Sequence, residues 1–537
     1  MDRLTRCASE LFALTAKGRP DAARLLEGAA SVAARHESGD FRLYARSPLV
    51  VDGRLFFLVR LRADKVLVRV TRRDFDRVTP PDVDGSIETK AGNTELACLV
   101  CPCSKANAAH LQHEIKHLRP RTNPGRAAFG AGDRIGLATP GHVRALRSTT
   151  YFPLFAQQSI REMDRTGRSP EDVMATAVWG LIEEGFTGEW GADADHLKTA
   201  ADIERVVPYG YTMFTLDPSV FIQNPDALSA DALRDAYARL PWDALRSSPE
   251  VLLVEYDVGR RTFADRHGAH SAELVFDEPS VVKCAVKYSA GIAHCATLAA
   301  LLRDKRGGRF DVEVSFDETD WPTSPLEHLF IASEFRRLGM QVDSLALRFP
   351  GAFEKGIDYK GDLAVFERTF AIHAAVRDAF DTYRLSIHSG SDKFAVYPIM
   401  SKYAGGKLHV KTAGTTYLEA LRVAARKDTA LFREILEFSH GRYAEDRRTY
   451  HVSADPARMP APRSVAPERY PGLLEDDAWR QVLHVAFGSV LTSGPEHDFR
   501  ARFCDMLSAN EEDFYATVER HFGKHLEALG ASTTTTS

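Results

Sequence analysis

The sequence has little of what marks secreted, membrane or nucleic-acid-binding proteins. Its seven cysteines are odd in number and scattered among apolar residues, which favours a reducing cytoplasm over a disulfide framework. The net charge of -5 is small for 537 residues, so nothing electrostatic supports binding to nucleic acid or to an acidic membrane. The N-terminal segment has no long apolar stretch, and no uninterrupted apolar run reaches membrane-spanning length. We therefore expect a cytoplasmic globular protein without nucleic-acid or membrane partners.

The chain is long enough for more than one structural unit. Residues 1–125 combine a helical start with strand-like runs of period two, and they are expected to form an N-terminal α/β extension. Residues 126–450 are expected to form the main domain, with a long insertion at 218–282. Residues 451–530 have a mainly helical pattern, and the threonine-rich tail 531–537 is expected to be disordered.

Short β-like runs alternate with amphipathic helical stretches through the main domain. Eight of these runs are predicted to be strands: 134–139, 151–157, 191–196, 211–217, 310–316, 343–349, 384–389 and 407–412. Alternation of this kind predicts a parallel sheet, and eight repeats favour a (β/α)8 barrel. An open doubly wound sheet is the competing arrangement, but no GxGxxG motif opens a helix after the first strand. The insertion is expected to cover part of the barrel mouth.

Ionisable residues gather at the C-terminal ends of the predicted strands, where the catalytic groups of a barrel lie. They include Asp195, His196, Glu313, Arg348, Glu354, Lys355, His388, Lys393 and Lys411. Two histidines with one or two carboxylates at one rim could form a metal site with open positions for a substrate, and the cations would face an anionic ligand. Each residue alone has an ordinary structural interpretation, such as a salt-bridged carboxylate, a core histidine or a snorkelling lysine. Their occurrence at one rim favours a functional site.

Several long segments resemble the tagaturonate/fructuronate epimerases of bacterial hexuronate catabolism. The segments include FGAGDRIGLATPGHVRAL, GADADHLKT, FEKGIDYKGDL, IHSGSDKFAVYP and HVKTAGTTYLEA. The resemblance runs in order from about residue 127 to about residue 525. More distantly, the Asp-His pair and the His-Ser-Gly-Ser run are similar to class II aldolases. The family resemblance implies a small-molecule ketohexuronate substrate and a divalent cation, with zinc, manganese, nickel, cobalt and iron all left open.

The resemblance also implies roles for individual residues. By this resemblance, Asp195 corresponds to the proton acceptor of the family and Glu313 to its proton donor. His196 and His388 correspond to metal ligands. A third metal ligand is needed. Glu354 is the candidate from its placement after the sixth predicted strand, and Glu313 is its rival.

Arg348, Lys393 and Lys411 are the candidates for binding the substrate carboxylate, because fixed cations pair well with it. The two sugar acids implied by the resemblance differ at a carbon one removed from the ketone, so an enolate cannot explain its inversion. A retro-aldol cleavage followed by re-addition on the other face can explain it. Transient hydride transfer is the competing route, but the sequence has no nicotinamide fingerprint. A class II-type aldolase that releases its fragments and a non-catalytic barrel subunit are the alternative functions.

The N-terminal extension contains a group of cysteines and histidines. It comprises Cys98, Cys101, Cys103, His110, His113 and His117. The spacing could suggest a zinc site, but the cysteines alternate badly for a single knuckle. We therefore favour a plain strand–turn–helix for this segment.

Overall fold

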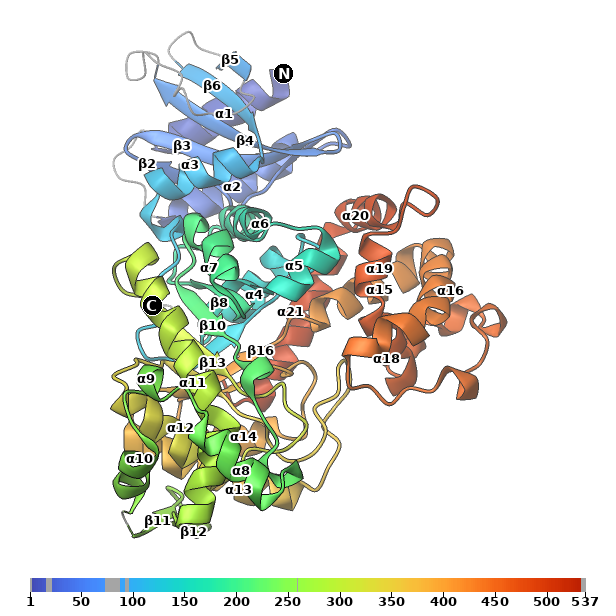
Figure 1. Ribbon diagram of the computed structural model, residues 1–537. Coiled ribbons are helices and arrows are strands. Elements are labelled where there is room, and N and C mark those ends of the chain that lie inside the picture. Colours follow the sequence, from blue (N-terminus) through green and yellow to red (C-terminus); the bar gives the residue numbers. More distant parts are fainter. Residues whose placement is uncertain (1, 16–21, 73–86, 92–95, 258, 533–537) are drawn as a thin grey trace.

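The computed structural model describes residues 2–15, 22–72, 87–91, 96–257 and 259–532, and a closed parallel barrel lies at its centre (Figure 1). The barrel strands are β7 (Ala128–Gly130), β8 (Phe152–Ser159), β9 (Gly191–Leu197), β10 (Met213–Leu216), β13 (Asp311–Ser315), β14 (Ser344–Ala346), β15 (Arg384–Ile387) and β16 (Leu408–Lys411). Each strand pairs in parallel with its neighbours, and β16 pairs with β7 to close the ring. The predicted (β/α)8 barrel is therefore confirmed, and the open sheet is excluded.

Helices connect the barrel strands and cover them from outside. They are α4 (Thr139–Leu146), α5 (Ile160–Thr166), α6 (Pro170–Glu183), α7 (Ala200–Val206), α11 (Glu278–Arg306), α12 (Pro325–Arg337), α13 (Leu363–Phe380), α14 (Tyr397–Ala404) and α15 (Thr415–Lys427). Five of them, α5, α6, α7, α11 and α12, begin with reciprocal capping boxes. In α12, for example, Ser324 accepts from the Glu327 backbone while Glu327 accepts from the Ser324 backbone. Such pairs satisfy N–H groups that a helix leaves open, so the sequence itself sets these helix starts.

The first barrel strand was predicted in the wrong place. Strand β7 lies at Ala128–Gly130, whereas the predicted strand 134–139 forms a loop leading into α4. The Asp133 carboxylate accepts hydrogen bonds from the backbone of Ile135, Gly136 and Ala138 at 3.0, 2.8 and 2.6 Å. A carboxylate that binds its own following backbone stabilises a turn in place of a strand.

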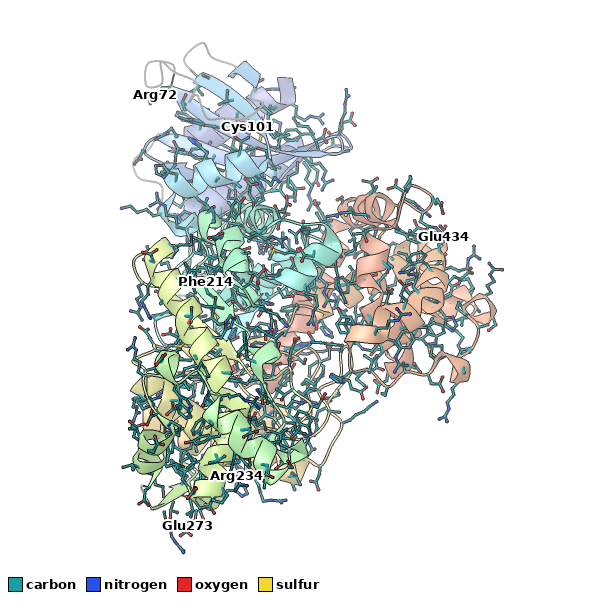
Figure 2. All side chains as sticks on the ribbon, in the orientation of Figure 1. Arg72, Cys101, Phe214, Arg234, Glu273 and Glu434 are labelled. Atoms are coloured by element: carbon teal, nitrogen blue, oxygen red, sulfur yellow. The ribbon has the colours of Figure 1, made fainter. Side chains whose placement is uncertain are left out.

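The N-terminal region forms a separate antiparallel sheet beside the barrel (Figure 1). Its elements are α1 (Asp2–Thr15), α2 (Ala22–His36), β1 (Phe41–Leu43), β2 (Leu49–Val51), β3 (Arg54–Leu61), β4 (Asp64–Arg72), β5 (Ile87–Ala91), β6 (Leu96–Pro102) and α3 (Lys105–Glu114). Strand β6 and helix α3 form the strand–turn–helix expected for the cysteine–histidine segment. Cys98 packs into the core of this region, and Cys101, labelled in Figure 2, packs into the cluster shared with the barrel. The two thiols therefore lie on opposite faces of β6 and do not share one site.

The insertion after β10 packs on the outside of the barrel. It contains α8 (Ala230–Ala238), α9 (Trp242–Leu245), α10 (Pro249–Tyr256), β11 (Arg260–Ala264) and β12 (Ser271–Val275). The three helices contact α11, and the β11–β12 hairpin contacts α12 and α13. The expectation that the insertion covers part of the barrel mouth is therefore wrong. Its apolar residues pack against the outer helices.

Helix α11 is the one described helix that is long and apolar enough to cross a membrane by length and composition. However, 67% of its apolar window is buried inside the protein. This is the burial of a core helix, and its apolar side chains pack against the barrel and the insertion.

The C-terminal region is helical, as expected. It contains α16 (Thr429–Asp446), α17 (Tyr470–Leu473), α18 (Asp477–Val485), α19 (Phe487–Leu491), α20 (Phe499–Ala509) and α21 (Glu511–Ala528). Helices α16 to α20 form a cluster at one side of the barrel in Figure 1, whereas α21 returns to pack against α4 and α15. The C-terminal helices are thus built into the barrel wall. Most of the predicted disordered tail, residues 533–537, lies outside the described residues.

The buried histidine of α4 predicts a pH-dependent stability. His142 is fully buried, and its Nε2 lies 2.9 Å from Thr416 Oγ1. Burial lowers its pKa to about 4. His142 therefore binds a proton near pH 6.5 in the unfolded chain but only near pH 4 in the folded chain. The free energy of unfolding consequently falls as the pH falls through this window. We expect His142 to reduce the free energy of unfolding by up to roughly 3 kcal/mol on acidification, a loss that urea midpoints at pH 7, 5.5 and 4 would measure. The variant His142→Gln should show a flatter dependence, and an unchanged slope would contradict the assignment.

Candidate active site

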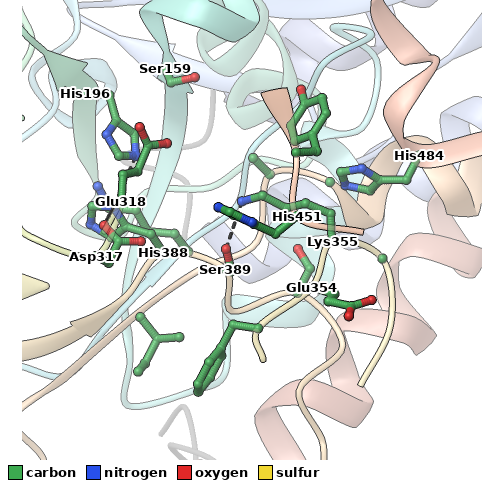
Figure 3. Close-up of a pocket in the computed structure, with 18 of the residues that line it drawn as sticks. Ser159, His196, Asp317, Glu318, Glu354, Lys355, His388, Ser389, His451 and His484 are labelled. Carbon is green, nitrogen blue, oxygen red and sulfur yellow. Dashed lines mark hydrogen bonds and ion pairs between the residues drawn. The ribbon is translucent and has the colours of Figure 1, made fainter. Parts of the chain in front are cut away.

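A cavity of about 670 Å³ opens at the C-terminal ends of the barrel strands (Figure 3). This volume is typical of a small-molecule site. Strand ends contribute Gln157, Asp195, His388 and Lys411 to its wall. The rest of the wall comes partly from residues 447–452, so the C-terminal region, and not the insertion, completes the barrel mouth.

Two histidines face each other at the cavity wall. His196, at the end of β9, and His388, directly after β15, approach to 3.2 Å between His196 Nε2 and His388 Nδ1. Nδ1 of His196 lies 2.9 Å from the Asp217 carboxylate. This contact makes Nδ1 the donor and leaves the lone pair of Nε2 facing His388. A carboxylate behind a histidine in this way is typical of metal-ligating imidazoles.

The geometry of the pair fits a divalent cation. Two imidazole nitrogens at about 2.1 Å from one ion lie roughly 3.0–3.4 Å apart for angles of 90–109° at the ion, and the observed separation falls in this range. The ligand atoms of Asp195, His196 and His388 all lie within 4.8 Å of one another. Burial lowers the pKa of His388, but Asp317 and Glu313 outweigh it and raise the pKa to about 10. These carboxylates favour positive charge at this position, which a cation would supply in place of the proton.

Asp195 stands beside the imidazoles and is held from two sides. Its Oδ1 accepts from Lys411 Nζ at 2.8 Å, and its Oδ2 accepts from Gln157 Nε2 at 3.1 Å. Burial opposes ionisation, but the neighbouring Lys411 and the two histidines prevail and lower the pKa of Asp195 to about 2. The residue is 5% exposed and lines the cavity, so an ionised carboxylate faces the substrate space.

At the cavity wall, Lys411 joins three carboxylates. Its Nζ lies 2.8 Å from Asp193, 2.8 Å from Asp195 and 2.6 Å from Glu313. Glu313 is fully buried, and it also accepts from His388 Nε2 at 2.5 Å and from His409 Nδ1 at 2.8 Å. It does not line the cavity, and it reaches the cavity wall through His388. Glu313 is thus arranged to orient an imidazole.

The structure brings together some of the predicted site residues and separates others. Asp195, His196, His388, Glu313 and Lys411 form one connected group.

Glu354, the predicted third metal ligand, lies elsewhere on the cavity wall. Its carboxylate accepts from the Ser453 hydroxyl and from Gln481, both at 2.6 Å. Lys393, predicted to bind the substrate carboxylate, donates to the backbone carbonyls of Glu354, Ile357 and Ser391. All three of its donors are therefore used within the protein.

Sequence reasoning missed Asp217 and His409 as supporting residues. Asp217 holds His196, and His409 holds Glu313. A signal for His409 was present, because it precedes Lys411 by two residues on β16. Alternate residues of a barrel strand point the same way, so both face the interior.

The loop that follows His388 is anchored by the C-terminal helices. Asp392, with φ of +58°, accepts from His521 at 2.6 Å and from Arg480 at 2.8 Å. Its backbone N–H donates to His525 Nε2 at 3.0 Å, while His525 Nδ1 donates to a backbone carbonyl. Both nitrogens of His525 are thus occupied, and the cluster fixes the loop.

Comparison with known proteins identifies the family of this chain. A family model described as tagaturonate epimerase matches residues 44–529. The tagaturonate/fructuronate epimerase of Thermotoga maritima is 39% identical over 494 residues, which cover 92% of this chain and 98% of that protein. Crystal structures of the fructuronate-tagaturonate epimerase UxaE from Cohnella laeviribosi each cover 94% of this chain and 100% of that chain. The glycerol complex has a TM-score of 0.83 at 34% identity, and the native form has 0.81 at 33%. The chain therefore belongs to the tagaturonate epimerase family and is an isomerase-class enzyme.

Proposed function

We propose that this enzyme interconverts D-tagaturonate and D-fructuronate with the help of a divalent cation held by His196 and His388. The observation that carries the proposal is the meeting of two imidazoles and the Asp195 carboxylate within 4.8 Å at the cavity wall. The names and sequence identity of the family relatives support the substrate assignment. Asp317, whose Oδ1 lies 3.2 Å from His388 Nδ1, is better placed than Glu354 to supply an oxygen ligand.

The reaction must invert a hydroxyl-bearing carbon one removed from the ketone. We propose that Asp195 accepts the proton of that hydroxyl, since its ionised carboxylate faces the cavity between Lys411 and Gln157. The bond between this hydroxyl-bearing carbon and the carbon next to the ketone then breaks. Its cleavage gives a three-carbon enediolate and a three-carbon aldehyde. Rotation of the aldehyde presents its other face. Re-formation of the bond gives an alkoxide on the inverted carbon, and return of the proton from Asp195 to this alkoxide yields the epimer. The bound cation would supply Lewis-acid stabilisation of the negative charge that develops at the ketone.

The proposed role of Glu313 follows from its contacts. As a carboxylate that accepts from His388, His409 and Lys411, it holds the imidazole of His388 in one orientation. If Glu313 is the proton donor, as predicted, its proton must pass through the imidazole of His388, because Glu313 does not line the cavity.

The function is tested by incubating metal-loaded protein with each ketohexuronate and following the products by NMR. We expect each sugar acid to give the other, and we expect a chelator to abolish the conversion until a divalent cation is restored. Trapping of three-carbon fragments, or a carbon isotope effect at the cleaved bond, would support the retro-aldol route. Absence of both would favour hydride transfer, and release of fragments faster than epimer formation would identify an aldolase.

A further inference from the structure

The cavity wall holds several cations, and most of them already have partners. Arg134 lies 2.8 Å from the Glu162 carboxylate, and Arg161 lies 2.8 Å from Glu318. These pairs are internally neutral, so their cations are only partly available to a ligand.

Three further cations are also used within the protein. Lys411 is surrounded by three carboxylates, and Lys393 by three backbone carbonyls. Arg447 donates to the Val452 carbonyl at 3.3 Å and lies over the ring of Tyr443. Two of the residues predicted to bind the substrate carboxylate, Lys393 and Lys411, therefore have no free donor for it.

Lys355 and Arg348 differ from these cations. The Lys355 ammonium donates to Ser389 Oγ at 2.8 Å, and within the described part of the chain no carboxylate lies within the 4.0 Å ion-pair distance of either side chain. An ammonium has three donors, so Lys355 keeps donors for a ligand. Nε of Arg348 is buried without a hydrogen-bond partner among the described residues. Both side chains line the cavity.

Resting on the proposed function, we propose that Lys355, together with Arg348, binds the carboxylate of the ketohexuronate and selects sugar acids over neutral ketoses. The contact with Ser389, visible in Figure 3, places the ammonium beside the residue that directly follows His388. The loop after β15 thus contributes His388 to the ketone end of the site and Ser389, which contacts Lys355, to the acid end. The carboxylate and the ketone occupy opposite parts of the substrate chain, which matches this division. Anchoring the acid would also retain the aldehyde fragment while it rotates.

The test compares Lys355→Met with the control Lys360→Met. Lys360 is five residues away, and its side chain is 47% exposed. For the ketohexuronate we expect Lys355→Met to raise KM by about 10- to 100-fold, because it removes a charged hydrogen bond, and we expect the control to change KM little. Lys355→Arg should restore much of the affinity, and Ser389→Ala should raise KM only severalfold. If Lys355→Met does not fold, these two variants carry the test.

A binding measurement separates this inference from the proposed reaction. Calorimetric titration with D-glycerate and with glycerol compares a carboxylate with the hydroxymethyl group that replaces it. The wild type should prefer glycerate by about tenfold or more, and Lys355→Met should lose that preference. If Lys355→Met loses the preference and the wild type does not epimerise ketohexuronates, the proposed reaction would be overturned but the acid site would be supported. An unchanged preference in the variant, or no preference in the wild type, would overturn the acid site even if epimerisation is observed.

Discussion

Replacing Asp195 with asparagine is expected to lower kcat for ketohexuronate epimerisation by about 10²- to 10⁴-fold, the usual contribution of a general base. Asparagine has nearly the same shape, and its one carbonyl oxygen can still accept from Lys411, but its amide cannot take the substrate proton. The buried carboxylate faces the cavity beside both imidazoles, so no described neighbour is better placed to replace it. Steady-state rates measured by NMR, together with the bound metal content, would check this expectation.

Asp164→Asn provides the matched control. Asp164 is 58% exposed and pairs with Arg205 on the surface at 2.7 Å, away from the cavity wall. The epimerase activity of Asp164→Asn should equal that of the wild type. Asp195→Asn with normal kcat would remove Asp195 from the chemistry. A variant that lost its metal along with its activity would instead make Asp195 a ligand.

Replacing Lys411 with methionine is expected to produce the largest loss of stability of any single substitution in the site. The buried ammonium lies within 2.8 Å of Asp193, Asp195 and Glu313, and its removal leaves three buried carboxylates without their shared cation. Breaking a buried ion pair from one side typically costs about 3–5 kcal/mol. Thermal and urea unfolding at neutral pH would measure the loss.

The pH dependence of Lys411→Met gives a second readout. Without the ammonium, the three carboxylates bind protons more tightly in the folded than in the unfolded state. A raised folded pKa contributes stability at low pH that is lost as the pH rises, so the variant should be least stable at neutral pH and should recover towards pH 5. Lys402→Met, which removes a half-exposed lysine paired with Glu367, should change little at either pH. Equal stability of the wild type and Lys411→Met at pH 7 would contradict the proposed charge balance.

The strand positions show where local sequence was sufficient. Seven of the eight predicted barrel strands overlap the observed ones, because most of them are short runs rich in apolar residues that are bounded by turn or helix-start residues. The exception is the first, where Asp133 binds the backbone that follows it and turns an apolar run into a loop. The spacing of apolar residues along the sequence does not reveal a hydrogen bond between a side chain and the backbone that follows it.

The hydrogen-bond partners of the ionisable residues could not be predicted from the neighbouring sequence. Glu354 and Lys393 lie after barrel strands, as predicted, but their side chains are used by Ser453, Gln481 and backbone carbonyls. Lys355 stands next to Glu354 in the sequence and keeps free donors. Adjacent residues of one loop thus differ in the contacts of their side chains, because different parts of the fold approach them.

The sequence by itself determined that strands and helices alternate eight times, and that imidazoles and carboxylates follow the strands. Parallel strands of a closed barrel bring their C-terminal ends to one rim, so the meeting of Asp195, His196 and His388 followed from that pattern. Only the tertiary structure decided which cations remain free for a ligand and which segment completes the cavity wall. Those outcomes depend on contacts between segments far apart in the chain, such as residues 447–452 with the barrel mouth, and no local spacing specifies them.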